Sequence, residues 1–363
     1  VERLAMVCEM AITPKGAVAR YEFYPAVIRS QARLTYTEVW QMLSADKANP
    51  GREDLLPHLK TLYGVFKVLL QARELRGAID FDSVETRMEF DARGKISRIV
   101  PEQRNEAHRL IEECMLAANV CAGNFLVERG QPVLFRVHYV PAPEKHTMLL
   151  AFLAELGRNL GGGSQPRPKH YADLLVKIRQ RPDFTLLQTI LLRSLKQAVY
   201  SPDNAGHFGL AFEAYVHFTS PIRRYPDLLV HRAIKACVAG KRYDGVDWEA
   251  LGRHCSETER RADEASRDVE NWLKCFYMQD HVGEVFEGRV TGVTGCGVFV
   301  TLDEYLVDGP GHLSELGRDY FQSEPSRPVL LGDRTGNRDP RPDRQRVEPG
   351  GATLGASHQT SAP

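Results

Sequence analysis

The chain has 363 residues, in which 47 Lys and Arg balance 47 Asp and Glu, and its hydrophobic fraction is 43%. This length exceeds what one hydrophobic core usually organises, so we expect two domains. No apolar run approaches the ~18 to 20 residues that span a bilayer, and the charged start argues against a secretory signal, so we expect a soluble cytoplasmic protein with no membrane segment. The seven cysteines include no Cys-x-x-Cys pair, which argues against a disulfide framework and a zinc ribbon.

Secondary structure follows from periodicity and from turn residues. Alternating apolar residues predict strands over residues 4–12, 17–30, 78–82, 86–90 and 95–100. Apolar residues at helical spacing predict helices over residues 34–43, 52–76, 105–129, 171–179, 184–200 and 248–280. Gly77 and Gly130 follow two of these helices at the position where glycine usually ends them.

At Val282 the pattern changes to short alternating stretches interrupted by glycines, which is typical of curved strands in a small barrel. A domain boundary is therefore expected after residue 281. Beyond Gly336 the sequence has no periodicity and little to bury, so we expect residues 337–363 to be disordered.

The neutral total conceals a basic segment. Residues 166–242 contain thirteen Lys and Arg against five Asp and Glu, a net charge of +8, which can serve a polyanion site but also occurs on ordinary surfaces. The chain lacks the short motifs of dinucleotide, nucleoside-triphosphate, metalloprotease and serine-hydrolase sites.

Two adjacent arginines in this segment suit a phosphate group. Ser220 can cap a helical turn, and Pro226 can start the helix that follows. Free N–H groups at a helix start, next to a guanidinium, match phosphate oxygens. Neighbouring helical residues point about 100° apart, so only one of Arg223 and Arg224 can face a ligand while the other meets a supporting partner. The alternative is a pair of surface arginines in ordinary salt bridges.

Several segments resemble the ribonuclease II/ribonuclease R family of RNB-type exoribonucleases, and bacterial ribonuclease R most of all. They are "RLAMVCEM", "RLTYTEVW", "RNEAHRLIEECM", "RPDFTLLQT", "YSPDNAGHFGLAFEAYVHFTSPIRRYPDLLVHRAIKA" and "ERRADEASRDV". "VGEVFEGRVTGVTGCGVFVTL" is similar to the RNA-binding OB-fold module that follows the catalytic domain in this family. The resemblance covers residues 1–336. It implies an α+β fold, with an RNB-type catalytic domain of mixed β-sheet core and long helices over residues 1–281 and an incomplete OB-fold barrel over 282–336.

The same resemblance implies a processive 3′-to-5′ exoribonuclease that degrades single-stranded RNA to nucleoside 5′-monophosphates with magnesium. We expect a monomer, and ribosomes or RNA-decay factors are candidate further partners. Arg223 matches the residue that stabilises the scissile phosphate. The expected RNA contacts are Tyr36 and Phe81 by base stacking, Glu112 at the terminal sugar, Arg224 beside Arg223, and Phe299 and His312 in the OB module.

The sequence departs from the family in two places. The family's metal site uses clustered aspartates ahead of "RLAMVCEM", and nothing comparable occurs here; Asp80 and Asp82 are the nearest imitation and read more simply as a solvent edge. We therefore expect no metal ligands and no RNA hydrolysis from this chain alone. In the OB module Cys296 replaces a platform aromatic, Pro310 and Gly311 weaken a strand, and the last strands are missing. The alternative function is a non-catalytic RNA-binding protein on the same scaffold.

Overall fold

The computed structural model describes residues 1–81, 85–102, 104–181, 183–294, 297–312, 321–323, 330–332 and 345–347. The helices are α1 (Tyr36–Ala45), α2 (Leu56–Arg76), α3 (Glu106–Glu128), α4 (Pro143–Glu155), α5 (Pro168–Ile178), α6 (Phe184–Ser194), α7 (Tyr225–Val238) and α8 (Trp248–Met278), with 3-10 turns at Glu53–Leu55 and Gln279–His281. The strands are β1 (Glu2–Ile12), β2 (Val18–Arg29), β3 (Thr86–Phe90), β4 (Ile96–Pro101), β5 (Phe135–Val137), β6 (Val199–Ser201), β7 (Phe286–Thr294), β8 (Gly297–Leu302), β9 (Asp308–His312), β10 (Phe321–Ser323), β11 (Leu330–Gly332) and β12 (Gln345–Val347).

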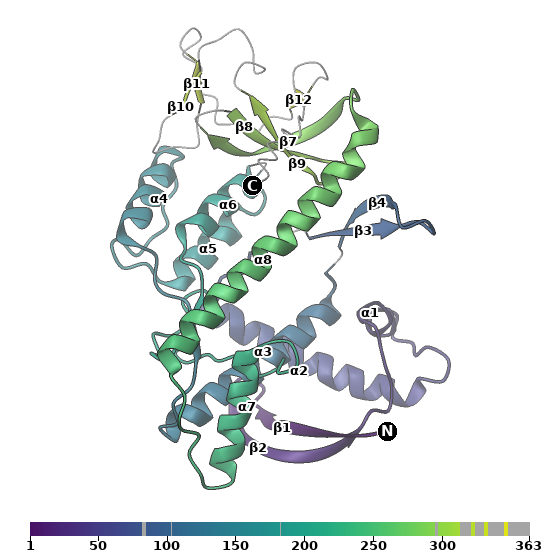
Figure 1. Ribbon diagram of the computed structural model, residues 1–363, viewed down its shortest axis with the longest axis vertical. Coiled ribbons are helices and arrows are strands. Elements are labelled where there is room, and N and C mark those ends of the chain that lie inside the picture. The colour runs from purple at the N-terminus through teal and green to yellow at the C-terminus, as the bar shows by residue number, and fades with distance from the viewer. Residues whose placement is uncertain are drawn as a thin grey trace, which may run out of the picture.

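The α+β class is confirmed, although the strands form separate ladders in place of one mixed sheet. Among the described residues, β1 pairs with β2, β3 with β4, β5 with β6 and β10 with β11, each antiparallel. The β1–β2 hairpin turns as expected at residues 13–17, where the Thr13 carbonyl accepts from the Gly16 amide. In Figure 1 this hairpin lies beside α7 at one end of the molecule, and α8 runs diagonally from there to the β7–β8–β9 sheet at the other end.

Two apolar clusters hold the first domain. The larger joins the β1–β2 hairpin, α3, β5 and α7, with Phe23 packed edge-to-face on Phe125 and Phe218 at its centre. The second lies between α4, α5 and α6 and includes Tyr171, whose side chain is fully buried. A third, smaller group seats α8 on β6 through Leu134, Tyr200 and Cys255. These contacts fix the segments that carry the candidate site.

Helix α3 runs through the larger cluster. Among the described residues, α3 is the one helix that is long enough and apolar enough in composition to cross a membrane. The expectation that no apolar run reaches that length is therefore wrong. Half of that stretch is buried inside the protein, where it packs against β1, α1, α2 and α7. A helix that is apolar on most sides is also what a domain core requires, and α3 carries buried Glu113 and Asn119 among its apolar residues.

Helix ends follow the sequence signals closely. Gly77 ends α2 with φ of 77°, and its amide donates to the Arg73 and Glu74 carbonyls. A side chain there would collide with Lys169, since an added Cβ would lie 2.6 Å from the Lys169 Cβ. At its N-terminal end, α1 begins with a reciprocal capping box formed by Thr35 and Glu38.

Two predictions for the first domain need correction, and one helix was missed. Residues 78–81 are not a strand; the Ile79 amide instead donates to the Gly209 carbonyl over 2.8 Å. The helix expected over 184–200 ends at Ser194, because Val199–Ser201 pair with Phe135–Val137. Helix α4 was not predicted at all.

The second domain is a four-stranded antiparallel sheet of order β12-β7-β8-β9, and within the described residues it does not close into a barrel. Val298, Val300 and Leu302 of β8 point into its small core, while Phe299 faces outward. Pro310 and Gly311 still lie in β9, opposite Phe299 and Val298. Gln345–Val347, inside the tail expected to be disordered, form β12 and pair with β7.

Candidate phosphate-binding site

The candidate site is built on a tight turn that leads into α7. The Ser220 carbonyl accepts from the amides of Arg223 and Arg224 at 3.2 and 3.0 Å. Pro226 lies in the first turn of α7, where its missing N–H costs nothing, as predicted. The expected Ser220 cap is replaced by a longer link, because the Ser220 amide donates to the Asp227 carboxylate at 2.7 Å.

The two arginines of this turn have different environments. Arg224 is one-fifth exposed, and its Nη2 donates to Asp227 Oδ1 at 2.9 Å. Arg223 is exposed, and its side chain makes no hydrogen bond or ion pair with the residues that the structure describes. One guanidinium is therefore held internally and the other is presented to solvent, which is the division that helical geometry predicted. A direct contact of Arg224 with RNA stays a prediction, and its pairing with Asp227 argues against it.

A neutral histidine lies beneath the arginines. Burial, followed by the positive charges of Arg224 and Arg136, lowers the pKa of His217 to about 2, so the ring is uncharged near neutral pH. Its Nδ1 is 2.9 Å from the Tyr200 hydroxyl. Arg136 stacks over the Tyr200 ring and pairs with Glu259 at 2.5 Å. The positive charges of these arginines therefore help to keep the imidazole uncharged.

Helix α3 is tied to the same region by Asn119. Its Nδ2 donates to the Tyr215 hydroxyl at 3.0 Å, and its Oδ1 accepts from the Phe218 amide at 2.9 Å. Glu112 lies seven residues earlier and thus on the same face of α3, two turns from Asn119. Its carboxylate pairs with Arg104 near the start of the helix. Its predicted contact with a sugar is compatible with that position and stays a prediction.

The two aromatics predicted to stack on bases occupy different settings. Tyr36 is 44% exposed, and one face of its ring stacks on His108 at a centroid distance of 4.0 Å. Phe81 is half-buried and packs against the α4–α6 cluster. The segment before Phe81 is held firmly, because Arg73 bridges Asp80 to buried Glu113. Asp82 lies outside the described residues.

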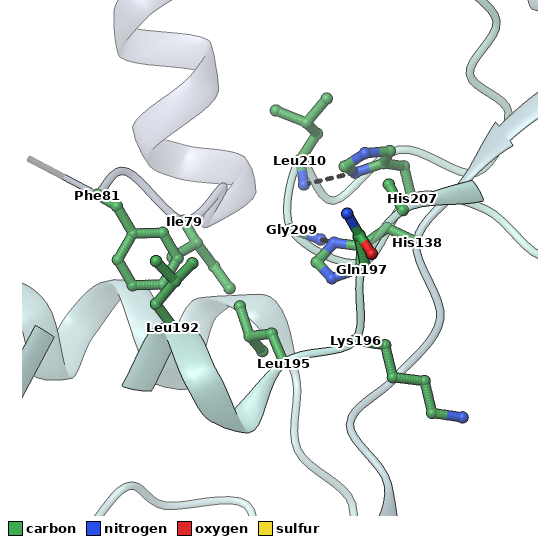
Figure 2. A pocket seen from close by; sticks show the side chains of 11 residues that line it. Ile79, Phe81, His138, Leu192, Leu195, Lys196, Gln197, His207, Gly209 and Leu210 are labelled. Atoms are coloured by element: carbon green, nitrogen blue, oxygen red, sulfur yellow. Dashed lines mark hydrogen bonds between the residues drawn. The ribbon is translucent and has the colours of Figure 1, made fainter. Parts of the chain in front are cut away.

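Phe81 borders a cavity of about 440 Å³. Figure 2 shows Phe81 and Ile79 on one side and His138 and His207 on the other. Each imidazole accepts a backbone N–H at Nδ1, from Gly209 at 2.9 Å and from Leu210 at 3.2 Å. Burial lowers the pKa of both histidines, that of His207 to about 3. The cavity is thus lined mainly by apolar side chains and two neutral rings, with Lys196 and Gln197 also at its wall.

The described residues do not fit a magnesium site. No group of three or more His, Cys, Asp or Glu side chains in the described ranges could hold a metal ion. Asp80 is engaged by Arg73 and by Arg109, at 3.2 and 3.7 Å, so it is an ion-pair member in this structure. Magnesium prefers several carboxylate and water oxygens in an octahedron, which these residues do not provide.

In the second domain, Phe299 is 42% exposed on β8. The ladder pairs Phe299 with Pro310 and Gly297 with His312, so position 312 is a diagonal neighbour of Phe299 across the two strands. The side chain of His312 and all of Cys296 lie outside what the structure describes, and the predictions for them stay predictions.

The fold and the site together define an α+β domain that displays an arginine at a helix start, followed by a small antiparallel module with an outward aromatic. The family model described as "RNB domain" matches residues 1–240, and the one described as "S1 RNA binding domain" matches residues 279–336. The chain therefore belongs to the RNB family.

Similar proteins agree with this assignment. Ribonuclease R of Escherichia coli is 49% identical over 350 residues, which cover 93% of this chain and 43% of that protein. Ribonuclease R of Aquifex aeolicus is 38% identical over 92% of this chain and 48% of its own length. The structure of Mycoplasma genitalium RNase R in complex with ribose-methylated single-stranded RNA superposes with a TM-score of 0.85 at 25% identity, over 96% of this chain and 55% of that one. The chain spans less than half the length of these curated relatives.

Sequence reasoning missed four residues that shape the site, namely Arg136, Asn119, His217 and Asp227. Asp227 had a signal, since an acidic residue in the first turn of a helix, three residues after an arginine, suggests an ion pair. The other three had none, because their partners lie 17 to 123 residues away in the chain.

Proposed function

We propose that this chain forms the RNA-binding centre of a 3′-to-5′ exoribonuclease that degrades single-stranded RNA processively to nucleoside 5′-monophosphates. The observation that carries the proposal is the division of the two arginines: Arg224 is paired with Asp227, whereas Arg223 is exposed at the start of α7 with no partner in the described part of the chain. A guanidinium beside a helix start offers several donors to a phosphate.

The surrounding residues suit this role. Arg223 would donate to the scissile phosphate and stabilise its developing negative charge. Tyr36 has one open face on which a base could stack, and Phe81 borders the cavity of Figure 2. Because stacking tolerates any base, such contacts suit an enzyme without sequence preference. Glu112 would accept from the terminal ribose.

The comparisons support RNA as the ligand. The structure of Mycoplasma genitalium RNase R with ribose-methylated single-stranded RNA is similar over 96% of this chain. The structure of the same protein with double-stranded RNA is similar over 89% of this chain. Residues 279–336 match an RNA-binding domain, where exposed Phe299 would supply a second stacking surface.

We propose magnesium as the ion for hydrolysis, although the described residues do not gather ligands for it. Hydrolysis would require carboxylates in addition to those described. This same observation favours the second candidate function, an RNA-binding protein without catalysis.

A binding and cleavage experiment tests the proposal. The chain is titrated into a short fluorescent single-stranded RNA, and the same RNA is then incubated with the chain and magnesium. We expect binding that Arg223→Ala weakens and that Arg242→Ala, which removes an exposed arginine of the same basic segment, leaves nearly unchanged. Equal binding by both variants would contradict the site. Release of mononucleotides by the chain alone would contradict the expectation of inactivity, and binding without release favours the second function.

A further inference from the structure

Asp227 occupies an unusual position for a carboxylate. It is the third residue of α7 and is fully buried, with no exposed surface. Removing a charge from water is costly unless hydrogen bonds and an opposite charge compensate for it. Its Oδ1 accepts from the Ser220 amide at 2.7 Å and from Arg224 Nη2 at 2.9 Å.

These two bonds span the turn that carries Arg223. Ser220 begins the turn and Arg224 ends it, and the amides of Arg223 and Arg224 both donate to the Ser220 carbonyl. A single carboxylate oxygen thus holds both ends of a five-residue segment, and Arg223 is the charged residue that this segment displays to solvent. The position of the Arg223 backbone therefore depends on Asp227, although the two side chains make no contact with each other that the structure describes.

The remaining polar atoms support a role confined to this turn. Asp227 Oδ2 and Arg224 Nε are buried and make no hydrogen bond with described residues. A pair built mainly for stability would use both carboxylate oxygens in a bidentate fork, as Asp183 does with Arg181 at 2.6 and 2.6 Å. Asp227 uses one oxygen for two links, which favours fixing the turn over strengthening the ion pair.

We propose that Asp227 is a positioning residue for Arg223, acting through Ser220 and Arg224. The proposal rests on the proposed function, because it takes Arg223 to be the phosphate contact. Replacement by asparagine would keep an acceptor of the same shape but remove the charge that holds Arg224. The turn would then sample other conformations, and Arg223 would lose its fixed direction.

The test is a double-mutant cycle on RNA binding by the full chain, measured by fluorescence anisotropy at several salt concentrations. Each phosphate contact contributes about 0.7 to the slope of log affinity against log salt for single strands. We expect Arg223→Ala to lower affinity about tenfold and to flatten the slope by about 0.7, which is the loss of one contact. Asp227→Asn should lower affinity about threefold to fivefold, and it should have little further effect in the Arg223→Ala background because it acts through that residue.

Asp183→Asn is the matched control, since it removes a similarly buried arginine–aspartate pair at the start of α6. It should leave RNA affinity and the salt slope unchanged. If Asp227→Asn fails to fold, Arg224→Gln breaks the same pair and is measured in the same cycle. Additive losses from positions 223 and 227, or no loss from Asp227→Asn and Arg224→Gln, would overturn the positioning role while leaving the proposed function intact. No loss from Arg223→Ala would instead overturn the proposed function.

Discussion

Mild acid should destabilise the folded chain through its buried histidines. Burial lowers the pKa of His217 to about 2 and that of His207 to about 3, with nearby positive charge adding to the effect. Both rings therefore stay neutral in the folded protein well below the ordinary histidine pKa of about 6.5. The unfolded chain binds protons at these residues as the pH falls through about 6.5, so stability is present above that pH and is lost below it.

The size of the loss follows from the proton linkage. Between about pH 7.5 and 5.5, each histidine that is neutral when folded and ordinary when unfolded removes about 1.4 kcal/mol from the free energy of unfolding. The two together remove about 2.7 kcal/mol, a large part of a typical total of about 5 to 15 kcal/mol. Carboxylates such as Asp183, whose pKa is lowered by its hydrogen bonds from Arg181, lose their contribution only near pH 4 and below. The histidines should therefore dominate this pH window.

The assay is equilibrium urea unfolding at several pH values, followed by circular dichroism. His217→Asn should reduce the loss of stability over this window by about 1.4 kcal/mol, because it removes one of the buried rings that stay neutral in the folded chain. Tyr200→Phe is the control: it removes the hydrogen bond to His217 and lowers stability, but it should keep the wild-type pH dependence. A pH-independent free energy between about pH 7.5 and 5.5, or equal slopes for His217→Asn and the wild type, would refute the reasoning.

Three further substitutions test the packing and the second domain. Gly77→Ala should cost about 1 to 3 kcal/mol in thermal unfolding, since φ is 77° and the new Cβ would meet Lys169; an unchanged melting temperature would contradict this. Glu113→Gln should cost about 3 to 5 kcal/mol in urea unfolding because it leaves Arg73, only 11% exposed, without its closer carboxylate, and a loss below about 1 kcal/mol would contradict the pairing. Phe299→Ala should weaken RNA binding by about 1 to 3 kcal/mol at an unchanged melting temperature, and unaltered affinity would remove Phe299 from the RNA surface.

Local signals predicted local structure well. The end of α2 at Gly77 needs only the preference of glycine for positive φ, and the start of α7 needs only the geometry of Pro226. Arg223 is exposed and Arg224 pairs with Asp227 because adjacent residues in a helical turn point about 100° apart. Each of these features depends on residues within about five positions of one another, so each can be predicted from the local sequence.

Features decided by distant partners were missed. Residues 78–81 have a strand-like composition, but their hydrogen bond goes to Gly209, far along the chain, and no ladder forms. Residues 199 and 200 continue a helical pattern, yet pairing with β5 makes them part of strand β6. Tertiary contacts override propensity in both cases. The buried links from Asn119 and Arg136 to the candidate site could not be predicted for the same reason.

The charge balance of the site leaves one arginine without a compensating carboxylate among the described residues. Arg136, Arg223 and Arg224 all lower the pKa of His217, so all three act on the same small region. Glu259 neutralises Arg136, and Asp227 neutralises Arg224. Because His217 remains neutral, the positive charge left uncompensated by the described residues around it is that of Arg223. A phosphate oxygen at Arg223 would complete this balance at the exposed end of the turn, whereas at Arg224 it would have to compete with a buried carboxylate already 2.9 Å away.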